Sequence, residues 1–291
     1  MFKIEMKAGE LAALITKMTA RESGGTALFS PMIANVNVKG GTMKWSWITS
    51  DHTAFTWGKA TKLKLSGKDG EYVFDSEIIE WINKLFGAEE KVSMEHRGES
   101  IYLKGDKYEA QLTPTDADAT RVEEASQMKI DEKTLVPKLG SYEWNEVSIK
   151  ASEINAILAP TSLVYPQKEI KVVRLSFNKK GSFAIIGSLE AHSMGVSRPI
   201  EAKVKKGFDI ILGSNFAEVM SVIDGDIKLF GIDKDRPLWI LKQTETATIG
   251  YLVAQYDESQ AEKDKQEAEE EKEKKEKDEE EPEEEEDKVD V

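Results

Sequence analysis

The sequence contains no cysteine in its 291 residues, so disulfides and cysteine-based metal sites are excluded. Its three histidines, His52, His96 and His192, have neither the H-x-H nor the H-E-x-x-H spacing of a zinc site. No apolar run approaches the roughly 20 residues that a membrane-spanning helix needs, and the opening MFKIEMKAGE does not resemble a secretion signal. We therefore expect an intracellular soluble protein with no metal and no membrane partner.

Motifs for catalysis and cofactor binding are also missing. No G-x-x-x-x-G-K-[ST] phosphate loop, G-x-G-x-x-G or G-x-S-x-G occurs. The segments WGKAT and SGKDG lack both the upstream glycine and the following Ser or Thr. Asp and Glu are plentiful, but no pair of them sits in a glycine-bounded loop. We therefore expect no enzymatic activity and no cofactor, and an enzyme of unrecognised type is the last alternative.

The formal net charge of −14 is distributed unevenly. Residues 257–291 hold 20 acids and 7 lysines, a balance of −13, whereas the other 256 residues hold 34 acids and 33 bases, a balance of −1. Such a composition cannot bury enough apolar surface to fold alone, so we predict a disordered acidic tail over 258–291. The simplest interpretation is a solubilising extension. The alternative is a segment that binds partners or competes with nucleic acid.

One apolar pattern occurs twice in the chain. ELAALITKM (10–18) and EINAILAPT (153–161) both open on Glu, and their apolar positions match 143 residues apart. Each follows an alternating strand and precedes a hairpin, and each half has a second helix that ends near Gly87 or Gly225. The order predicts a duplicated domain: 1–115 and 145–257, joined by a polar connector over 116–144.

Each predicted domain has two helices and about eight strands. The helices are few and widely separated, unlike the alternating strand–helix rhythm of a doubly wound parallel sheet. We therefore predict an α+β fold with two helices packed on curved antiparallel sheet in each domain.

Five short segments resemble one family. The start MFK leads into a strand and a helix with Gly9 near its start, and ITSDH (48–52) resembles a family stretch that ends in histidine, here His52. LVPKLGSY resembles the end of a family connector, and DRPLWILKQ and IGYLVAQYDE resemble its last two strands. In this order, they are similar to DNA sliding clamps of the proliferating cell nuclear antigen type.

The resemblance implies a DNA-clamp fold whose subunits close into a ring, a homotrimer, around duplex DNA. Such a clamp is a processivity factor: it tethers the replicative polymerase and other replication and repair proteins by short peptide motifs, and a clamp loader places it on DNA without sequence preference. The implied location is the cytoplasm at the nucleoid, or the host cell for a viral protein.

The resemblance also implies a basic inner surface on the helices. Matching or nearby basic residues are Lys17, Arg21, Lys84, Lys150, Lys168, Lys203, Lys205 and Lys206. Some positions depart from the family, because Trp81, Ala156 and Ala159 stand where bases are expected and NFAEVMSVID contains none. The alternative is that these lysines are ordinary solvated surface.

A partner-peptide pocket is implied on the outer side, where a few apolar anchors are buried. The matching positions and their neighbours are Ile48, Leu135, Val136, Pro137, Tyr142, Pro237, Tyr251 and Val253. Individually, each of these residues also fits a structural core.

Ring closure requires two open strand edges. We expect them at KYEAQLT (107–113) and SFAIIGSLE (182–190), with the subunit-interface residues Tyr108, Ala110, Leu112, Phe183 and Ile185. The alternatives are a hetero-oligomeric or non-ring clamp-like subunit, and an acidic-tailed interaction scaffold that does not encircle DNA.

Overall fold

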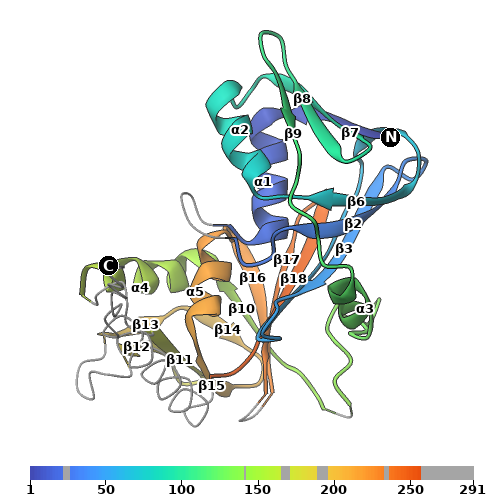
Figure 1. Cartoon of the computed structure of the whole chain (residues 1–291). Helices are drawn as coiled ribbons and strands as arrows, with labels where there is room; N and C mark the ends of the chain where they lie inside the picture. The colour runs from blue at the N-terminus through green and yellow to red at the C-terminus, as the bar shows by residue number, and fades with distance from the viewer. Residues whose placement is uncertain (22–26, 141, 165–170, 189–195, 233–235, 257–291) are drawn as a thin grey trace, which may run out of the picture. The chain divides into compact units, whose positions relative to one another are not determined.

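The computed structural model describes residues 1–21, 27–140, 142–164, 171–188, 196–232 and 236–256 (Figure 1). At 159–164, 171, 183, 185–188 and 196 it describes the backbone alone. The chain divides into two units, Met1–Gln255 and Tyr256–Val291, and the fold below is that of the first. The predicted tail and Lys168 lie outside the described residues.

The described residues of the first half form nine strands and two helices before the connector. Its elements are β1 (Phe2–Lys7), α1 (Ala8–Thr19), β2 (Met32–Asn37), β3 (Thr42–Ile48), β4 (Ala54–Ala60), β5 (Lys64–Gly67), β6 (Gly70–Phe74), α2 (Glu77–Leu85), β7 (Lys91–Arg97), β8 (Ser100–Lys104) and β9 (Glu109–Leu112). A short helix that the sequence analysis did not predict, α3 (Thr120–Ser126), follows in the connector.

The second half repeats this order element by element. Its elements are β10 (Asn145–Lys150), α4 (Ala151–Val164), β11 (Lys171–Phe177), β12 (Ser182–Ser188), β13 (Val196–Ile200), β14 (Ala202–Val204), β15 (Phe208–Leu212), α5 (Ser214–Ser221), β16 (Asp226–Gly231), β17 (Leu238–Gln243) and β18 (Ala247–Val253). The pairing repeats too: β1 pairs with β5 and β7, and β10 pairs with β14 and β16. The α+β class with antiparallel sheets and few helices is therefore confirmed, while the domain boundaries stay predictions.

Three antiparallel sheets carry these strands among the described residues. Their orders are β5-β1-β7-β8-β9, β14-β10-β16-β17-β18-β4-β3-β2-β6, and β13-β12-β11-β15. The nine-stranded sheet crosses from one half to the other where β18 pairs with β4, from Ala247↔Ala60 to Val253↔Ala54. We call this internal β4–β18 junction the seam.

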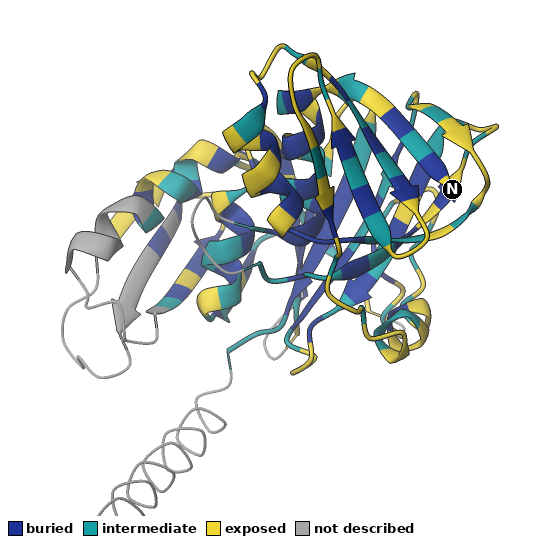
Figure 2. Cartoon of the chain, turned by 45° about the horizontal axis from the view of Figure 1, so that its top comes forward, coloured by how far each residue is buried: buried dark blue, intermediate teal, exposed yellow. Residues whose placement is uncertain are grey.

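The helices cover the core with the apolar stripe that the sequence predicts. In α1 the buried positions include Leu11, Ile15 and Met18, spaced three and four apart. α1 ends at Thr19, and the capping residue Ala20 adopts a left-handed conformation with φ 46°. α1 packs beside α2, and α4 beside α5. Figure 2 shows the alternation of buried and exposed positions along both helices and strands.

Candidate nucleic-acid interface, peptide surface and subunit edges

The outward faces of α1 and α2 carry few free cations. Lys17 is half-buried, and its Nζ lies 3.7 Å from Asp224 Oδ1. On α2, Lys84 is exposed but pairs with Glu80 at 3.2 Å, one helical turn away. Trp81 is 42% exposed on the same helix. The resemblance predicts a positively charged face on α1 and α2, but the net charge of this face is close to zero.

Arg21 ties the end of α1 to the start of α2. Its Nη1 donates to the Ser76 carbonyl oxygen at 2.8 Å, and its Nη2 pairs with Glu80. Only 12% of its side chain is accessible. Hydrogen bonds from Lys84 and then Arg21 lower the pKa of Glu80. An Arg21 substitution would therefore disturb the helix pair as well as any contact with DNA.

The other predicted bases lie in the second half. Lys150, Lys203 and Lys206 are exposed at the paired β10–β14 edge or just after it. Lys205 Nζ is 2.7 Å from Glu146 Oε2, and a hydrogen bond from Lys205 lowers the pKa of this glutamate. The described part of α5 carries no basic side chain. The structure thus groups these four lysines near β14, but it does not place them on the α1–α2 helix pair.

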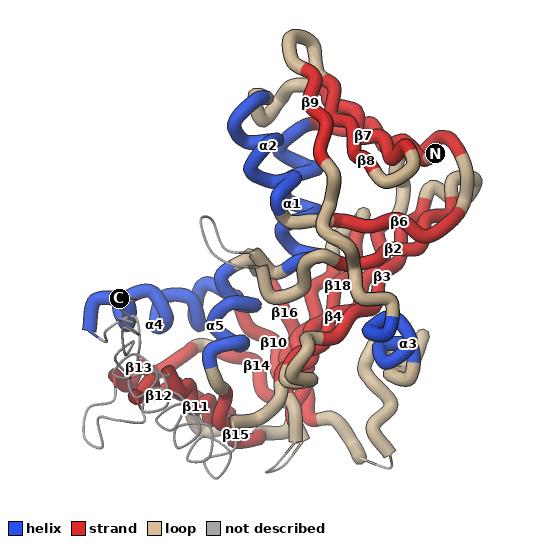
Figure 3. Tube along the Cα trace, in the orientation of Figure 1, coloured by secondary structure: helices blue, strands red, loops and turns tan. Residues whose placement is uncertain are grey.

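A second apolar cluster lies under the connector, and we call it the connector cluster. Its buried members are Phe55, Ala125, Val136, Phe230, Trp239, Leu241 and Leu252, with Ile48, Trp57, Met128, Ile130, Leu135 and Trp144 partly buried around it. Three predicted peptide-pocket residues, Ile48, Leu135 and Val136, are therefore brought together. Together with the half-buried Trp57 and Met128 they form an apolar patch that is only partly covered (Figure 3 shows α3 and the connector).

Two tryptophans fasten the connector to this cluster. Trp239 Nε1 donates to the Leu135 carbonyl oxygen at 2.9 Å, and Trp144 Nε1 donates to the Pro137 carbonyl oxygen at 2.9 Å. Trp239 packs closely against Gly250, where a Cβ atom would be 1.9 Å from the indole. Leu135 has φ 59°, an uncommon left-handed conformation for a leucine.

Tyr251 and Val253 were predicted to join the peptide pocket, and the structure shows that this is wrong. Both are 1% exposed and belong to the main core cluster. The Tyr251 hydroxyl donates to the Lys17 carbonyl oxygen, and burial raises the pKa of this phenol. Side chains alternate between faces along a strand, so the intervening Leu252 is the residue that faces the connector cluster.

The remaining pocket candidates lie at the surface beside the connector. Tyr142 is 47% exposed, and the Arg236 guanidinium lies 4.3 Å from the centre of its ring. Pro237 is half-buried and Pro137 is buried. Sequence reasoning missed Trp239 and Leu252. The fully apolar start of β17, LWIL, was the available signal that both faces of this strand are covered.

A tight turn carries the histidine of the family-like ITSDH stretch. Thr49 Oγ1 donates to Asp51 Oδ1 at 2.6 Å, and the Thr53 N–H donates to the same oxygen at 3.1 Å. Partial burial opposes ionisation of Asp51, but these hydrogen bonds outweigh it and lower the pKa. His52 has φ 57°, and its Nε2 lies 3.1 Å from Glu124 Oε2 on α3. The turn thus contacts the connector helix.

The hydrogen bond between Trp239 and the connector gives a direct prediction. Trp239→Phe should lower the free energy of unfolding by about 2 kcal/mol, because a buried bond is lost and a void remains. It should also speed amide hydrogen exchange over 130–137. Trp57→Phe is the matched control, since the described residues give Trp57 no hydrogen bond to the connector. Equal exchange in the two variants would contradict this role of Trp239.

The sheet order identifies which strands end at an open edge. β9 is an edge of the five-stranded sheet, and Ala110 and Leu112 lie on it. Tyr108, directly before it, is 52% exposed. The expected second edge at 182–190 is wrong, because β12 pairs with β11 on one side and with β13 on the other. Phe183 and Ile185 are therefore on an inner strand, and the edges of this sheet are β13, next to β12, and β15.

Comparison with known proteins gives a match at the level of fold. No family model matches the sequence, and no curated protein matches it. A solved structure of A. fulgidus PCNA bound to the C-terminal region of FEN-1 matches with a TM-score of 0.61 and 14% identity, over 89% of this chain and 99% of that one. PCNA from Thermococcus kodakaraensis matches with a TM-score of 0.63 and 15% identity, over 88% and 100%. The chain has the sliding-clamp fold.

Two absences hold for the part of the chain that the structure describes. No helix there is long and apolar enough to span a membrane. No group of three or more His, Asp or Glu side chains there is arranged to hold a metal ion.

Proposed function

We propose that this protein is a non-enzymatic sliding clamp, whose copies close into a ring around duplex DNA and tether a DNA polymerase and other replication and repair proteins. The observation that carries the proposal is the seam. The chain joins its own two halves by pairing β4 with β18, and it leaves β9 and β13 open. The outermost strands of the three described sheets are β5, β9, β14, β6, β13 and β15. Among them, β9 corresponds in the repeat to β18 and β13 to β4, so these two edges are the unpaired copies of the seam.

The internal seam predicts the register between copies. Phe74 and Leu212 each end the strand before a second helix. We follow the paired residues across the sheet from these ends, through β6, β2, β3 and β4 in the first half and through β15, β11, β12 and β13 in the second. Gly58 of β4 and Arg198 of β13 then occupy equivalent positions. We follow the pairs in the same way from the starts of α1 and α4, through β1, β7, β8 and β9 in the first half and through β10, β16, β17 and β18 in the second. Ala110 of β9 and Tyr251 of β18 then occupy equivalent positions.

Transferring the seam pairs to two copies then gives a specific contact. Within one chain, Tyr251 pairs with Thr56 and Ile249 pairs with Gly58 at the seam. At the equivalent positions, Ala110 of one copy would pair with Val196 of the next, and Tyr108 would pair with Arg198. The exposed Tyr108 ring would thus lie opposite a cation on the next copy, an arrangement that favours contact. Closure also satisfies backbone groups that an open edge leaves unpaired.

The proposed contacts with DNA and partners follow from the same placement. Lys17, Lys84 and the lysines near β14 would approach phosphates, which position a protein without reading sequence. The exposed part of the connector cluster, with Ile48 and Leu135, would receive an apolar anchor of a partner peptide. The homotrimer and the clamp loader come from the resemblance to sliding clamps.

Assembly size and topological binding test the proposal together. Three chains of 32.6 kDa give about 98 kDa, which sedimentation equilibrium measures independently of shape. On linear duplex DNA, a ring should be retained when both ends are blocked and lost when one end is freed. Two results would contradict the proposal: a 32.6 kDa monomer, or equal retention on DNA with blocked and with free ends. Either would favour the alternative, an interaction scaffold that does not encircle DNA.

A further inference from the structure

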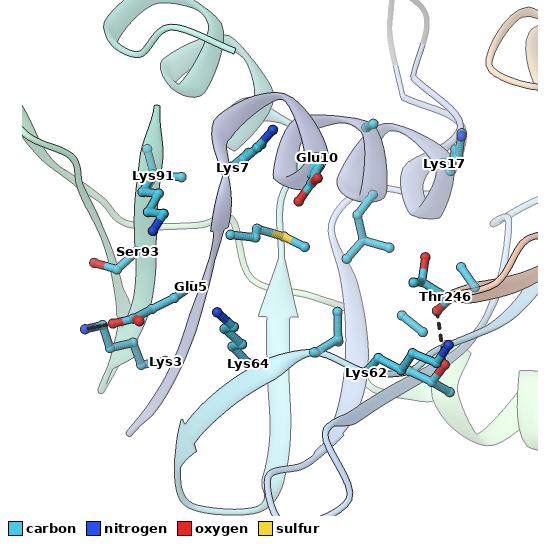
Figure 4. A pocket seen from close by; sticks show the side chains of 18 of the residues that line it. Lys3, Glu5, Lys7, Glu10, Lys17, Lys62, Lys64, Lys91, Ser93 and Thr246 are labelled. Atoms are coloured by element: carbon cyan, nitrogen blue, oxygen red, sulfur yellow. Dashed lines mark hydrogen bonds and ion pairs between the residues drawn. The ribbon is translucent and has the colours of Figure 1, made fainter. Parts of the chain in front are cut away.

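A lysine-lined cavity lies beside α1, apart from the connector cluster (Figure 4). Its volume is about 890 Å³. Its described lining comes from β1, α1, β5, β7 and β18, from the ends of β4, β8 and β17, and from the turns that precede β5, β9 and β18. Eight lysines and three carboxylates line it. This volume is typical of ligand pockets, which enclose roughly 300–1,000 Å³. We call it the lysine cavity.

Three of these lysines have no ion-pair partner among the described residues: Lys62, Lys64 and Lys91. All three are exposed. Figure 4 shows Lys64 and Lys91 on either side of Glu5, with Lys62 at the other end of the cavity near Thr246. A hydrogen bond from Lys3 lowers the pKa of Glu5, and the charges of Lys64 and Lys91 lower it further. The cavity therefore has an excess of positive charge.

The backbone fixes Lys62 at the mouth of the cavity. Its φ is 60°, a left-handed conformation that costs a non-glycine residue energy. The flanking residues hold it there, since the Thr61 N–H donates to the Thr246 carbonyl oxygen at 2.7 Å and the Leu63 N–H donates to the Gly41 carbonyl oxygen at 3.0 Å. The cation is thus presented by a turn that two other segments brace.

The floor of the cavity is apolar, and this decides the kind of ligand. Met6, Leu14 and Leu63 are half-buried there, and Ile249 lies beside them at 2% exposure. A phosphate backbone would pair with the lysines, but it presents charged oxygens and no aliphatic side chain to such a floor. An acidic peptide with one or two aliphatic side chains matches both the cations and the floor.

We propose that the lysine cavity binds an acidic peptide segment of a partner protein. Carboxylates of the peptide contact Lys62, Lys64 and Lys91, and its aliphatic side chains contact the floor. This site is separate from the peptide surface at the connector cluster, because the two share no lining residue. It requires neither ring closure nor binding to DNA, so the two proposals fail independently.

The test is fluorescence anisotropy with the full-length chain and a labelled eight-residue peptide of six Glu or Asp and two Leu. Lys62→Glu/Lys64→Glu/Lys91→Glu should weaken binding about tenfold or more. The matched control, Lys44→Glu/Lys68→Glu/Lys180→Glu, changes three exposed lysines outside the cavity lining and should change affinity less than about threefold. Leu14→Ser on the floor, and a peptide with both Leu replaced by Ser, should each weaken binding several-fold.

Two outcomes would overturn the inference. Equal losses in the cavity and control triple variants would show that the peptide senses only net charge. Loss of affinity for a 20-base-pair duplex in the cavity variant, with no peptide binding by the native chain, would make the cavity a nucleic-acid contact instead. Circular dichroism and assembly size of each variant establish that the fold is retained.

Discussion

Replacing Gln111 by proline should convert the assembled protein into monomers and abolish its retention on end-blocked DNA. The Gly105 N–H donates to the Tyr108 carbonyl oxygen at 3.0 Å, at the turn between β8 and β9. Hydrogen-bonded pairs alternate in an antiparallel ladder, so Leu103↔Ala110 is bonded within the sheet. Gln111 then presents its N–H and C=O to the open edge. Proline removes that outward donor while leaving the bonds to β8 in place.

Gln111→Ala is the matched control for this experiment. It loses the same side-chain hydrogen bond, 3.2 Å from Gln111 Nε2 to Ser100 Oγ, but keeps the backbone N–H. It should therefore assemble like the native chain in sedimentation equilibrium. If Gln111→Pro also remains an oligomer, β9 is not the joining edge. If both variants dissociate, the side chain and not the strand edge is responsible.

The parts of the fold that the sequence predicted are those governed by periodicity. The stripe of Leu11, Ile15 and Met18 specifies the buried face of α1 because one helical face recurs every 3.6 residues. The repeat of that stripe in the second half predicted the duplicated order of elements. α3 was missed because TRVEEAS is short and polar, and only Ala125 is buried.

The position of a strand within a sheet could not be read in the same way. The strand at 182–190 is apolar, and an apolar strand was interpreted as an edge that needs a cover. In the structure β12 has a partner on both sides. Its neighbour β13, one of the two edges of this sheet, contains Pro199, a residue that edge strands tolerate. Which strand ends a sheet depends on long-range pairing, and local sequence does not specify it.

The candidate site shows the same division. Ile48, Leu135 and Val136 were predicted to lie together, and they do. Tyr251 and Val253 were placed on the wrong face, because an error of one residue in a strand moves a side chain to the other side of the sheet. The bond from Arg21 to the Ser76 carbonyl joins residues 55 positions apart, and no local pattern reveals it.

A buried histidine should make the fold sensitive to acid. His96 is 5% exposed, and its ring lies within 5.7 Å of the centres of the Phe2, Tyr72 and Phe74 rings. Its Nε2 has no hydrogen-bond partner in the described part of the chain. Burial lowers the pKa of His96 from 6.5 to about 4, and the charge of the N-terminus adds to this effect. The ring is therefore neutral in the folded protein at neutral pH.

The sign and size of the effect follow from proton linkage. Between pH 6.5 and about 4 the unfolded chain binds a proton at His96 that the folded chain does not, so the free energy of unfolding falls as the pH falls. The stability is fully present above pH 6.5, and the total loss is about 3 kcal/mol for a shift of this size. Carboxylates with a lowered pKa, such as Glu80 and Asp51, also make the folded protein less stable in acid. A variant is therefore needed that removes only the contribution of His96.

His96→Phe provides that variant, because phenylalanine fits the aromatic cluster and does not titrate. Urea unfolding at pH 8 and pH 4.5 should show a smaller loss of stability on acidification for His96→Phe than for the native chain, by about 2–3 kcal/mol. His52→Gln is the matched control: His52 is exposed, so its substitution should leave the native loss nearly unchanged. Comparing losses between two pH values within each protein removes the cost of repacking the cluster, which is the same at both. If the native chain and His96→Phe lose equal stability between these pH values, His96 takes up its proton in the folded state, and the aromatic cluster must open to admit it.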